Sequence, residues 1–291
     1  MDAFTIKDLE NLTGIKAHTI RIWEQRYRFL KPQRTQTNIR YYSNEELKTL
    51  LNIALLNKYG FKISHIDRMT TDEIREKINT LSDAQAQQER VINDLVQATV
   101  DLNLERIEKV LSGFIATKGM ERTVLQIIFP FLEKIGILWL TGHINPAQEH
   151  LVSNLIRQKL IVAIDSIQTS LYTQRTILFF LPEGEHHELG ILFMHYLLKS
   201  RGLQTIYVGA NVPVKDLAYV VNLKKPDIIF SHLTATTSSF HFEKFLNQVS
   251  QQIAGTPVIL SGTLTQHYKK TPPPGIEFKK SLQEVIEFLA A

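Results

Sequence analysis

Residues 176–190 read TILFFLPEGEHHELG, and this stretch decides the fold of the last third of the chain. A short apolar run, TILFFLP, is followed directly by a loop with three glutamates, two histidines and two glycines. An apolar stretch of helical length, LGILFMHYLLKSRG, comes next. A short apolar run bounded by turn residues is typical of a buried strand, whereas the longer stretch favours a helix. The sequence therefore predicts a strand–loop–helix unit with a densely charged loop.

The same alternation of strands and helices continues to the C-terminus. Four more apolar runs read as strands: TIYVG, DIIFSHL, PVILSG and IEFKK. Helical patterns separate them, except between the last two, where the link has no defined pattern. Strands joined by helical crossovers form a parallel, doubly wound sheet, so we expect a Rossmann-like domain with five strands over 173–291. In a flavodoxin-like strand order, the first and third of these strands are neighbours.

The chain upstream of this domain divides into two further zones. Residues 79–172 have apolar faces with a helical period and short connections, which predicts a four-helix bundle whose third stretch is interrupted by Pro130. Residues 1–78 read as short helices around an extended loop or hairpin, LKPQRTQTNIRYYS. We therefore expect a multi-domain α and α/β protein with domains at 1–78, 79–172 and 173–291.

Composition excludes several classes of protein. The 291 residues are 44% hydrophobic and 21% charged, which is typical of globular proteins. The absence of cysteine excludes disulfides, zinc–thiolate sites and iron–sulfur clusters. The N-terminus does not read as a secretory signal, and no apolar run is expected to approach a membrane-spanning length. We expect a cytoplasmic protein without a membrane partner.

Basic charge is concentrated near the N-terminus. Between residues 14 and 40 the only acid is Glu24, and the bases are Lys16, Arg21, Arg26, Arg28, Lys31, Arg34 and Arg40. Such a cluster is suited to a polyphosphate surface. In IKAHTIRIWEQRYRF, Ile20 and Trp23 have the spacing of residues that pack inward. We predict a winged helix-turn-helix in which the second helix, with Lys16, His18, Thr19, Arg21 and Arg26, and the following loop, with Arg34, Arg40 and Tyr41, contact double-stranded DNA.

This region resembles the MerR family of bacterial transcription regulators. The resemblance covers about 75 residues through FTIKDLENLTGIKAHTIRIWEQRY, Pro32 and Arg34, IRYYS and LLNKYGFKISHI. It implies a homodimer in which the second helix reads the major groove and the wing contacts the DNA backbone. The variant RIWEQRY resembles the subgroup that carries cobalamin-binding domains.

The loop EGEHHELG has three readings from its residues. A zinc site needs three or four ligands, and His186 and His187 are adjacent, so they have little chance of converging on one ion. Acid/base catalysis needs a substrate pocket and a nucleophile, and no nucleophile stands out. A solvated turn would explain the histidines. However, polar and glycine residues also follow the third strand (Ser231, Leu233) and the fourth (Ser261, Gly262), at the edge where doubly wound sheets bind ligands.

Together these loops resemble the cobalamin-binding domain of methionine synthase and the adenosylcobalamin mutases. The matching positions are Glu185-x-His187-x-x-Gly190, Ser231-x-Leu233 and Ser261-Gly262. The resemblance implies that His187 is the lower axial ligand of cobalt and that Glu185, usually Asp, orients it. The nucleotide tail would enter a cleft lined by the serine and the glycine pair, with Gly190 making room. Ser261 replaces the first glycine of that pair, and His186 and Glu188 are expected to be ordinary surface residues.

The middle zone contains a third resemblance. Trp139 is followed by Glu149 and His150 at ten and eleven positions. Taken alone, Trp139 reads as bundle core and the pair as an exposed helix start. With the flanking domains, Trp-x9-Glu-His resembles the helical cap of CarH/LitR-type photoreceptor regulators. That resemblance implies that these three residues hold 5′-deoxyadenosine and that His150 takes the vacated upper position on cobalt after photolysis.

The main hypothesis is a DNA-binding transcriptional repressor without enzyme activity or catalytic residues. It would bind adenosylcobalamin between the cap and the Rossmann-like domain. Cofactor and light would then change its state between dimer and tetramer and its affinity for promoter DNA. A second hypothesis is a light-independent cobalamin sensor or a cofactor-free regulator, motivated by Ser261. A third, a cobalamin-dependent enzyme, is disfavoured because no catalytic barrel is present.

Overall fold

The computed structural model describes residues 4–168, 175–234, 240–253 and 255–290. The chain divides into two compact units, Met1–Leu155 and Ile156–Ala291, and each has its own buried apolar core. The predicted boundaries at 78 and 172 describe a finer division into three domains and stay a prediction.

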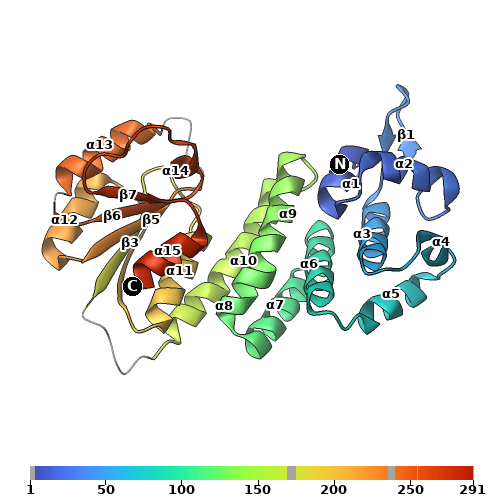
Figure 1. The fold of residues 1–291 in the computed structure, drawn as a ribbon, viewed down its shortest axis with the longest axis horizontal. Coiled ribbons are helices and arrows are strands. Elements are labelled where there is room, and N and C mark those ends of the chain that lie inside the picture. Colours follow the sequence, from blue (N-terminus) through green and yellow to red (C-terminus); the bar gives the residue numbers. More distant parts are fainter. Residues whose placement is uncertain (1–3, 169–174, 235–239, 254, 291) are drawn as a thin grey trace. The chain divides into compact units, whose positions relative to one another are not determined.

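The first unit begins with the predicted winged helix-turn-helix, which we call the head (Figure 1). Three of its helices start with a capping box, in which a threonine or serine side chain and an acid three residues later satisfy backbone N–H groups: Thr5 with Asp8, Ser43 with Glu46, and Thr70 with Glu73. The elements of the head are α1 (Ile6–Thr13), α2 (Ala17–Arg26), β1 (Gln33–Arg34), β2 (Arg40–Tyr41), α3 (Asn44–Lys58), α4 (Ile63–Ile66) and α5 (Thr71–Thr80).

The core of the head fixes α2 and the hairpin. Ile20 and Trp23 are buried, as predicted from their spacing. The loop after α2 forms the antiparallel hairpin β1–β2, and Asn38 takes the left-handed conformation in its turn. Tyr42, fully buried, pairs with Phe4 through two backbone hydrogen bonds of 2.8 and 2.7 Å. The hairpin is thereby anchored to the start of α1.

The helical region that follows contains the four predicted stretches within residues 81–168. They are α6 (Ala84–Val100), α7 (Leu104–Lys118), the continuous run of α8 (Met120–Thr123), η1 (Val124–Ile128) and α9 (Phe129–Leu140), and α10 (Pro146–Asp165). α6 packs on α7, on α9 and on α3 of the head. The helix α10 starts in the first unit and ends in the second.

Pro130 does not interrupt the third stretch, contrary to the sequence reading. The turn before it widens into a π-helix, in which the N–H of Phe129 donates to the carbonyl of Val124, five residues back. Proline lacks the N–H for the usual helical bond and crowds the preceding turn, and a widened turn is one way in which a helix absorbs such a disturbance. The helix therefore runs from Met120 to Leu140 without a break.

This same run corrects the expectation about apolar length. By length and composition, Met120–Leu140 is apolar enough to cross a membrane, which a core helix of a globular protein can also be. Ile127, Phe131 and Leu138 are fully buried, and the run packs on α6 and α7. The run therefore contributes buried side chains to the core of the bundle, and 39% of its most apolar stretch is buried within the structure.

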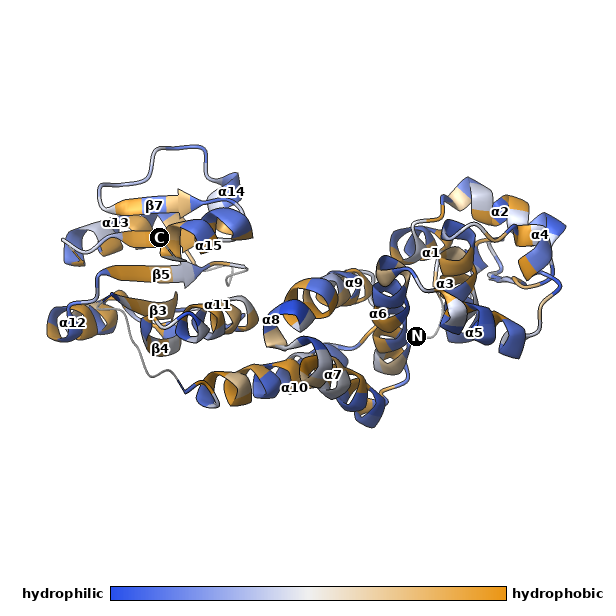
Figure 2. Cartoon of the chain, turned by 60° about the horizontal axis from the view of Figure 1, so that its bottom comes forward, coloured by the Kyte–Doolittle hydropathy of each residue, from blue (hydrophilic) through white to orange (hydrophobic). Residues whose placement is uncertain are grey.

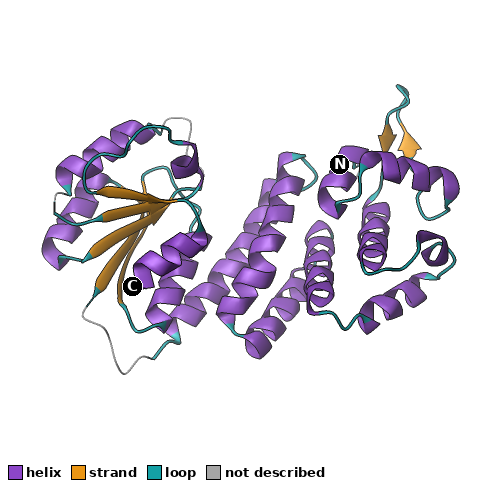
Figure 3. Cartoon of the chain, viewed as in Figure 1, coloured by secondary structure: helices purple, strands orange, loops and turns teal. Residues whose placement is uncertain are grey.

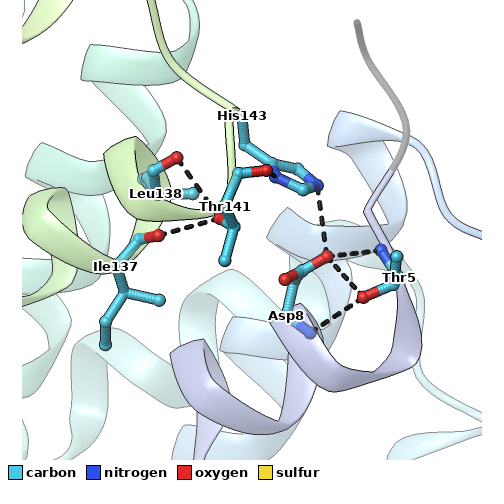
Figure 4. Close-up of polar contacts among 6 residues, drawn as sticks. All are labelled: Thr5, Asp8, Ile137, Leu138, Thr141 and His143. Atoms are coloured by element: carbon cyan, nitrogen blue, oxygen red, sulfur yellow. Dashed lines mark hydrogen bonds and ion pairs between the residues drawn. The ribbon is translucent and has the colours of Figure 1, made fainter.

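Asp8 connects the head to the loop after α9 within the first unit (Figure 4). Its buried Oδ2 accepts hydrogen bonds from the N–H and the hydroxyl of Thr5, at 2.7 and 2.5 Å, and lies 3.3 Å from Nε2 of His143. The ring of His143 stacks on Phe4 with centroids 4.2 Å apart, and its Nδ1 lies 2.9 Å from the carbonyl of Thr141. The capping residues of α1 thus also contribute a contact between the head and the bundle.

The second unit is a five-stranded parallel sheet covered by helices (Figure 3). The strand order β4-β3-β5-β6-β7 is the predicted flavodoxin-like order. The short helix α14 lies in a segment for which the sequence indicated no structure. The elements are β3 (Thr176–Pro182), α11 (Leu189–Ser200), β4 (Gln204–Val212), α12 (Val214–Lys224), β5 (Ile228–His232), α13 (Phe242–Gln252), β6 (Val258–Ser261), α14 (Thr263–His267), β7 (Ile276–Lys279) and α15 (Leu282–Ala290).

The two faces of this sheet carry different residues of each strand. Leu178, Ile229 and Leu260 belong to the core under α12 and α13. Because side chains alternate along a strand, Phe179 and Phe230 face the other side, where α11 and α15 lie (Figure 1). Both β3 and β5 are hydrophobic along most of their length, as expected of strands buried on both faces (Figure 2).

His195 of α11 makes the stability of this unit dependent on pH. Its ring stacks between Phe179 and Tyr207, with centroids 5.6 and 5.5 Å away, and its buried Nδ1 has no hydrogen-bond partner among the described residues. Burial, aided by the charge of Lys199, lowers the pKa of His195 to about 4. Below pH 6.5 the unfolded chain therefore binds a proton at His195 that the folded chain does not bind. The free energy of unfolding falls as the pH is lowered to about 4.

We expect this histidine alone to lower the free energy of unfolding by about 2 kcal/mol between pH 7 and pH 5. The variant His195→Phe should lose less stability than the wild type over the same interval. Urea unfolding of both proteins at the two pH values measures the difference, and equal losses would contradict the assignment.

Candidate cofactor site and nucleic-acid interface

Glu185 and His187 form a closely held pair at the carboxyl end of β3. The carboxylate of Glu185 is fully buried, and its Oε1 accepts from the N–H of His187 at 2.9 Å and lies 2.6 Å from Nδ1 of that ring. Its Oε2 accepts from the N–H of Thr234 at 2.8 Å. The His187 side chain is 59% exposed. A carboxylate on Nδ1 orients an imidazole for metal binding through Nε2, which is the arrangement common to metal-bound histidines.

Glu188 is not the ordinary surface residue that we expected. Its two carboxylate oxygens contact Arg157 of α10, at 2.8 Å from Nε, and the hydroxyl of Tyr207 of β4, at 2.5 Å. Burial and the neighbouring Glu188 raise the pKa of Tyr207. Glu188 therefore fastens the start of α11 to a helix and a strand. His186 is exposed, in agreement with the expectation.

Ser231 and Ser261 lie on opposite faces of the sheet. In the register of β5 and β6, Ser231 pairs with Leu260 and His232 pairs with Ser261. Leu260 faces α12 and α13, so Ser231 faces the same side. The hydroxyl of Ser231 is buried and has no hydrogen-bond partner among the described residues, as an unfilled polar contact for a ligand would be.

The two predicted glycines are in close contact with β5. Gly262 has a φ of +100°, and a Cβ placed on it would lie 2.3 Å from the carbonyl oxygen of Leu233. A Cβ on Gly190 would lie 2.9 Å from Cδ2 of His232. Gly262 requires glycine because its φ is positive and the close neighbour is backbone, whereas a Cβ on Gly190 would require the His232 ring to shift. The predicted contacts of both glycines with a ligand stay a prediction.

His232 is the residue at this site that the sequence reasoning missed. Its Nδ1 lies 2.8 Å from the hydroxyl of Ser261, and its ring packs beside Gly190. Burial lowers the pKa of His232, while the nearby charge of Glu185 opposes this effect, so the ring is neutral at pH 7. The signal was available in the sequence, because His232 stands between Ser231 and Leu233.

The predicted cap residues belong to the bundle and are accessible. Trp139 is 49% exposed, which excludes the plain reading of a buried core residue. Leu140 and Leu151 are exposed as well, so the end of α9 and the start of α10 present apolar side chains to solvent. Nδ1 of the exposed His150 lies 3.0 Å from Oε2 of Glu149. These three residues are therefore available for a ligand, and their roles remain a prediction.

A site with several protein ligands to a metal finds no support. Within the described ranges, no group of three or more histidine, aspartate and glutamate side chains is arranged to hold an ion.

Two clefts of about 770 and 540 Å³ lie beside α13, and the smaller is lined by Glu183, Gly184 and Pro213 among others. None of the predicted cofactor residues lines either cleft.

The predicted DNA-contacting residues are mostly accessible. Trp23 is buried behind them, so α2 presents its polar face outward. Lys16 and Arg34 make only exposed contacts, to Glu10 at 3.1 Å and to Asn38 at 2.7 Å. The exposed members of the set are Lys16, His18, Arg21, Arg26 and Arg34, and Thr19 is half-buried.

Arg40 and Tyr41 of β2 are already engaged within the head. Nε of Arg40 lies 2.8 Å from Oε2 of Glu24, whose other oxygen accepts from the hydroxyl of Tyr42. The hydroxyl of Tyr41 donates to Gln33 at 2.5 Å. Arg40 therefore holds the hairpin against α2, a role that the sequence did not indicate, and its contact with phosphate stays a prediction.

Three family models match successive parts of the chain. Residues 4–73 match a MerR HTH family regulatory protein. Residues 91–163 and 175–278 each match a B12 binding domain, by two different models. The matched parts contain the head, the helical bundle and the parallel sheet, in that order.

Two curated relatives are similar along almost the whole chain. The HTH-type transcriptional repressor CarA of Myxococcus xanthus is 27% identical over 285 residues, which are 97% of this chain and 94% of CarA. The repressor CarH of the same organism is 26% identical over 274 residues, 91% of each chain. Among solved structures, the Methanosarcina barkeri monomethylamine corrinoid protein superposes with a TM-score of 0.51 at 13% identity, covering 60% of this chain and 85% of that chain. This last likeness concerns the fold alone.

Proposed function

We propose that the chain represses transcription under the control of a bound corrinoid, because it matches models of a MerR HTH regulator and of B12 binding domains and is similar along nearly its full length to the CarA and CarH repressors. It acts by binding promoter DNA and is not an enzyme. We place this action in the cytoplasm, where bacterial DNA lies.

The observation that carries the proposal is the Glu185–His187 pair. A buried carboxylate 2.6 Å from Nδ1 sets the ring for coordination through Nε2, and the ring itself is accessible. We propose that His187 would coordinate cobalt and that the hydroxyl of Ser231, which has no hydrogen-bond partner among the described residues, would form a hydrogen bond with the corrinoid. Leu233 and Gly262 hold the ends of β5 and β6 together, since the backbone of Leu233 lies against Gly262 and its N–H donates to the carbonyl of Ser261 at 2.8 Å.

We propose that residues of the bundle contact the adenosyl group. The exposed Trp139 and His150 and the half-buried Glu149 would hold this group. When bound, adenosylcobalamin would supply a cobalt–carbon bond that light can break. We propose that loss of the adenosyl group removes its contacts with the bundle and thereby changes the assembly of the protein between dimer and tetramer. A ligand shifts an assembly only through contacts that differ between the two states.

A route from the bundle to the DNA-binding surface runs through Asp8. The loop after α9, which follows Trp139 closely, contacts α1 through His143. α1 packs on α2, which carries the predicted DNA-contacting side chains. Both contacts lie within one compact unit, so a shift of this loop reaches the head through packed side chains.

A second candidate function is regulation without light. Ser261 stands where the resemblance has a glycine, and its hydroxyl lies 2.8 Å from Nδ1 of His232, which favours weak or selective binding of the cofactor over tight retention. A cobalamin sensor that responds to occupancy alone, or a regulator that binds no cofactor, would fit such a site.

Reconstitution with adenosylcobalamin in the dark separates these functions. We expect the purified protein to retain the corrinoid through gel filtration and to change both its visible spectrum and its elution volume after illumination. A changed spectrum with an unchanged elution volume would leave a cobalamin sensor and exclude the light-driven change of assembly. Failure to retain any corrinoid would contradict the proposed cofactor.

A further inference from the structure

His232 occupies the position at which two small residues would otherwise leave a space. On one side of the ring lies Gly190, in the first turn of α11. A Cβ placed on Gly190 would lie 2.9 Å from Cδ2 of His232. Ser261 ends β6 on the other side, with its hydroxyl 2.8 Å from Nδ1. Both contacts lie on the face of the sheet that α11 covers. An imidazole therefore fills the gap between α11 and β6.

The serine at 261 is the partner that holds this ring. The side chain of Ser261 is buried, and a glycine at this position would offer no group to His232. The neutral imidazole can donate from or accept at Nδ1, and a serine hydroxyl can do either, so the bond is satisfied in both tautomers. The departure from a glycine pair and the histidine between Ser231 and Leu233 are thus one feature.

We propose that His232, held by Ser261, closes the end of the corrinoid site that would receive the nucleotide tail, and so selects corrinoids by their lower nucleotide. This inference rests on the proposed function. A complete cobalamin must displace the ring, break the bond to Ser261 and replace the packing against Gly190. A cobinamide, which has the corrin ring but no nucleotide, needs none of these changes and can still be bound by His187.

The packing around the His232 ring is tight enough to separate corrinoids with a nucleotide from those without one. A carbon atom at the Gly190 Cβ position would already be 2.9 Å from the ring, so a bulky heteroaromatic base cannot enter while His232 stays in place. Gly262 offers no alternative path, because the backbone of Leu233 lies against it at 2.3 to 2.8 Å from the Cβ position. Movement of the His232 side chain is therefore the step on which entry of the tail depends.

Absorbance titrations of the full chain with hydroxocobalamin and with diaquocobinamide test the proposal. We expect the wild type to bind cobinamide at least as tightly as cobalamin. The double variant His232→Gly, Ser261→Gly should bind cobalamin about tenfold or more tightly than the wild type, while its affinity for cobinamide changes by less than about threefold. The variant His241→Ala, which removes an exposed histidine of the same unit, should match the wild type.

The outcomes separate this proposal from the proposed function. Wild type that prefers cobalamin by about tenfold or more, or a double variant that changes both affinities equally, would overturn the role of His232 and leave cobalamin control intact. Absence of binding of either corrinoid by every protein would overturn the proposed function and this inference together. Because two glycines in strands can loosen the sheet, His232→Ala is measured alongside, with thermal unfolding of each variant, and the same preference is expected of it.

Discussion

Replacing His187 with alanine is expected to lower the affinity for hydroxocobalamin by about a hundredfold. The ring of His187 is oriented by the fully buried Glu185, at 2.6 Å from Nδ1, and we propose Nε2 as the coordinating atom. Without the imidazole, cobalt loses its nitrogen ligand from the protein, and the visible spectrum of the remaining bound corrinoid should become that of a water-ligated form. Glu185→Gln should weaken binding less, by about tenfold, because an amide can still orient the ring.

The neighbouring histidine provides the control for this prediction. His186 is exposed, carries the same side chain and lies one residue away. His186→Ala should bind with the wild-type affinity and spectrum in the same titration. If both alanine variants behave alike, or if His187→Ala retains the wild-type spectrum, the assignment of the lower ligand is wrong.

The double variant Arg21→Glu, Arg26→Glu is expected to bind promoter DNA about a hundredfold more weakly at about 0.1 M salt. Both side chains are exposed on α2, the helix that the buried Ile20 and Trp23 hold against the head. Loss of two phosphate contacts should also reduce the slope of log affinity against log salt by about 2. Fluorescence anisotropy over a series of salt concentrations measures both quantities.

A second pair of arginines controls for total charge. Arg75 of α5 and Arg122 of α8 are exposed and lie outside the basic segment. Arg75→Glu, Arg122→Glu changes the net charge by the same amount and should lower the affinity by less than about threefold. Equal losses in the two double variants would show that DNA binding responds to net charge and not to the surface of α2.

The elements with a strong local pattern were predictable from the sequence. The apolar runs of the second unit became β3, β5 and β6, and the flavodoxin-like strand order is the one observed. Thr5 and Ser43 cap helices through partners three positions further on, a local pattern that can be read from a sequence. The Glu185–His187 contact was also foreseeable, because two residues separated by one position after a strand are neighbours in space.

Contacts between distant segments were not predictable in this way. Arg40 was expected to contact only phosphate, yet Glu24, sixteen residues away, holds it in the head. Glu188 was expected at the surface, and its partners Arg157 and Tyr207 come from other elements. Each of these pairs depends on the packing of separate elements, which periodicity and composition do not encode.

Pro130 and His232 show two other limits. A proline normally ends a helical pattern, but here the π-turn before Pro130 lets the helix continue, and such a turn has no signature in hydrophobic periodicity. His232 stands between two motif positions, Ser231 and Leu233, but the sequence pattern does not show which side chains it contacts. The register of β5 against β6 is what places His232 on Ser261.

The central claim is that a corrinoid held by His187 controls the DNA affinity of the head. Its most direct test is the affinity for one DNA fragment, selected from random sequences, at a fixed salt concentration and in three states: cofactor-free, loaded with adenosylcobalamin in the dark, and loaded then illuminated. The account predicts that the dark loaded protein binds at least about tenfold more tightly than the other two. Equal affinities in all three states, with the corrinoid demonstrably bound, would contradict it.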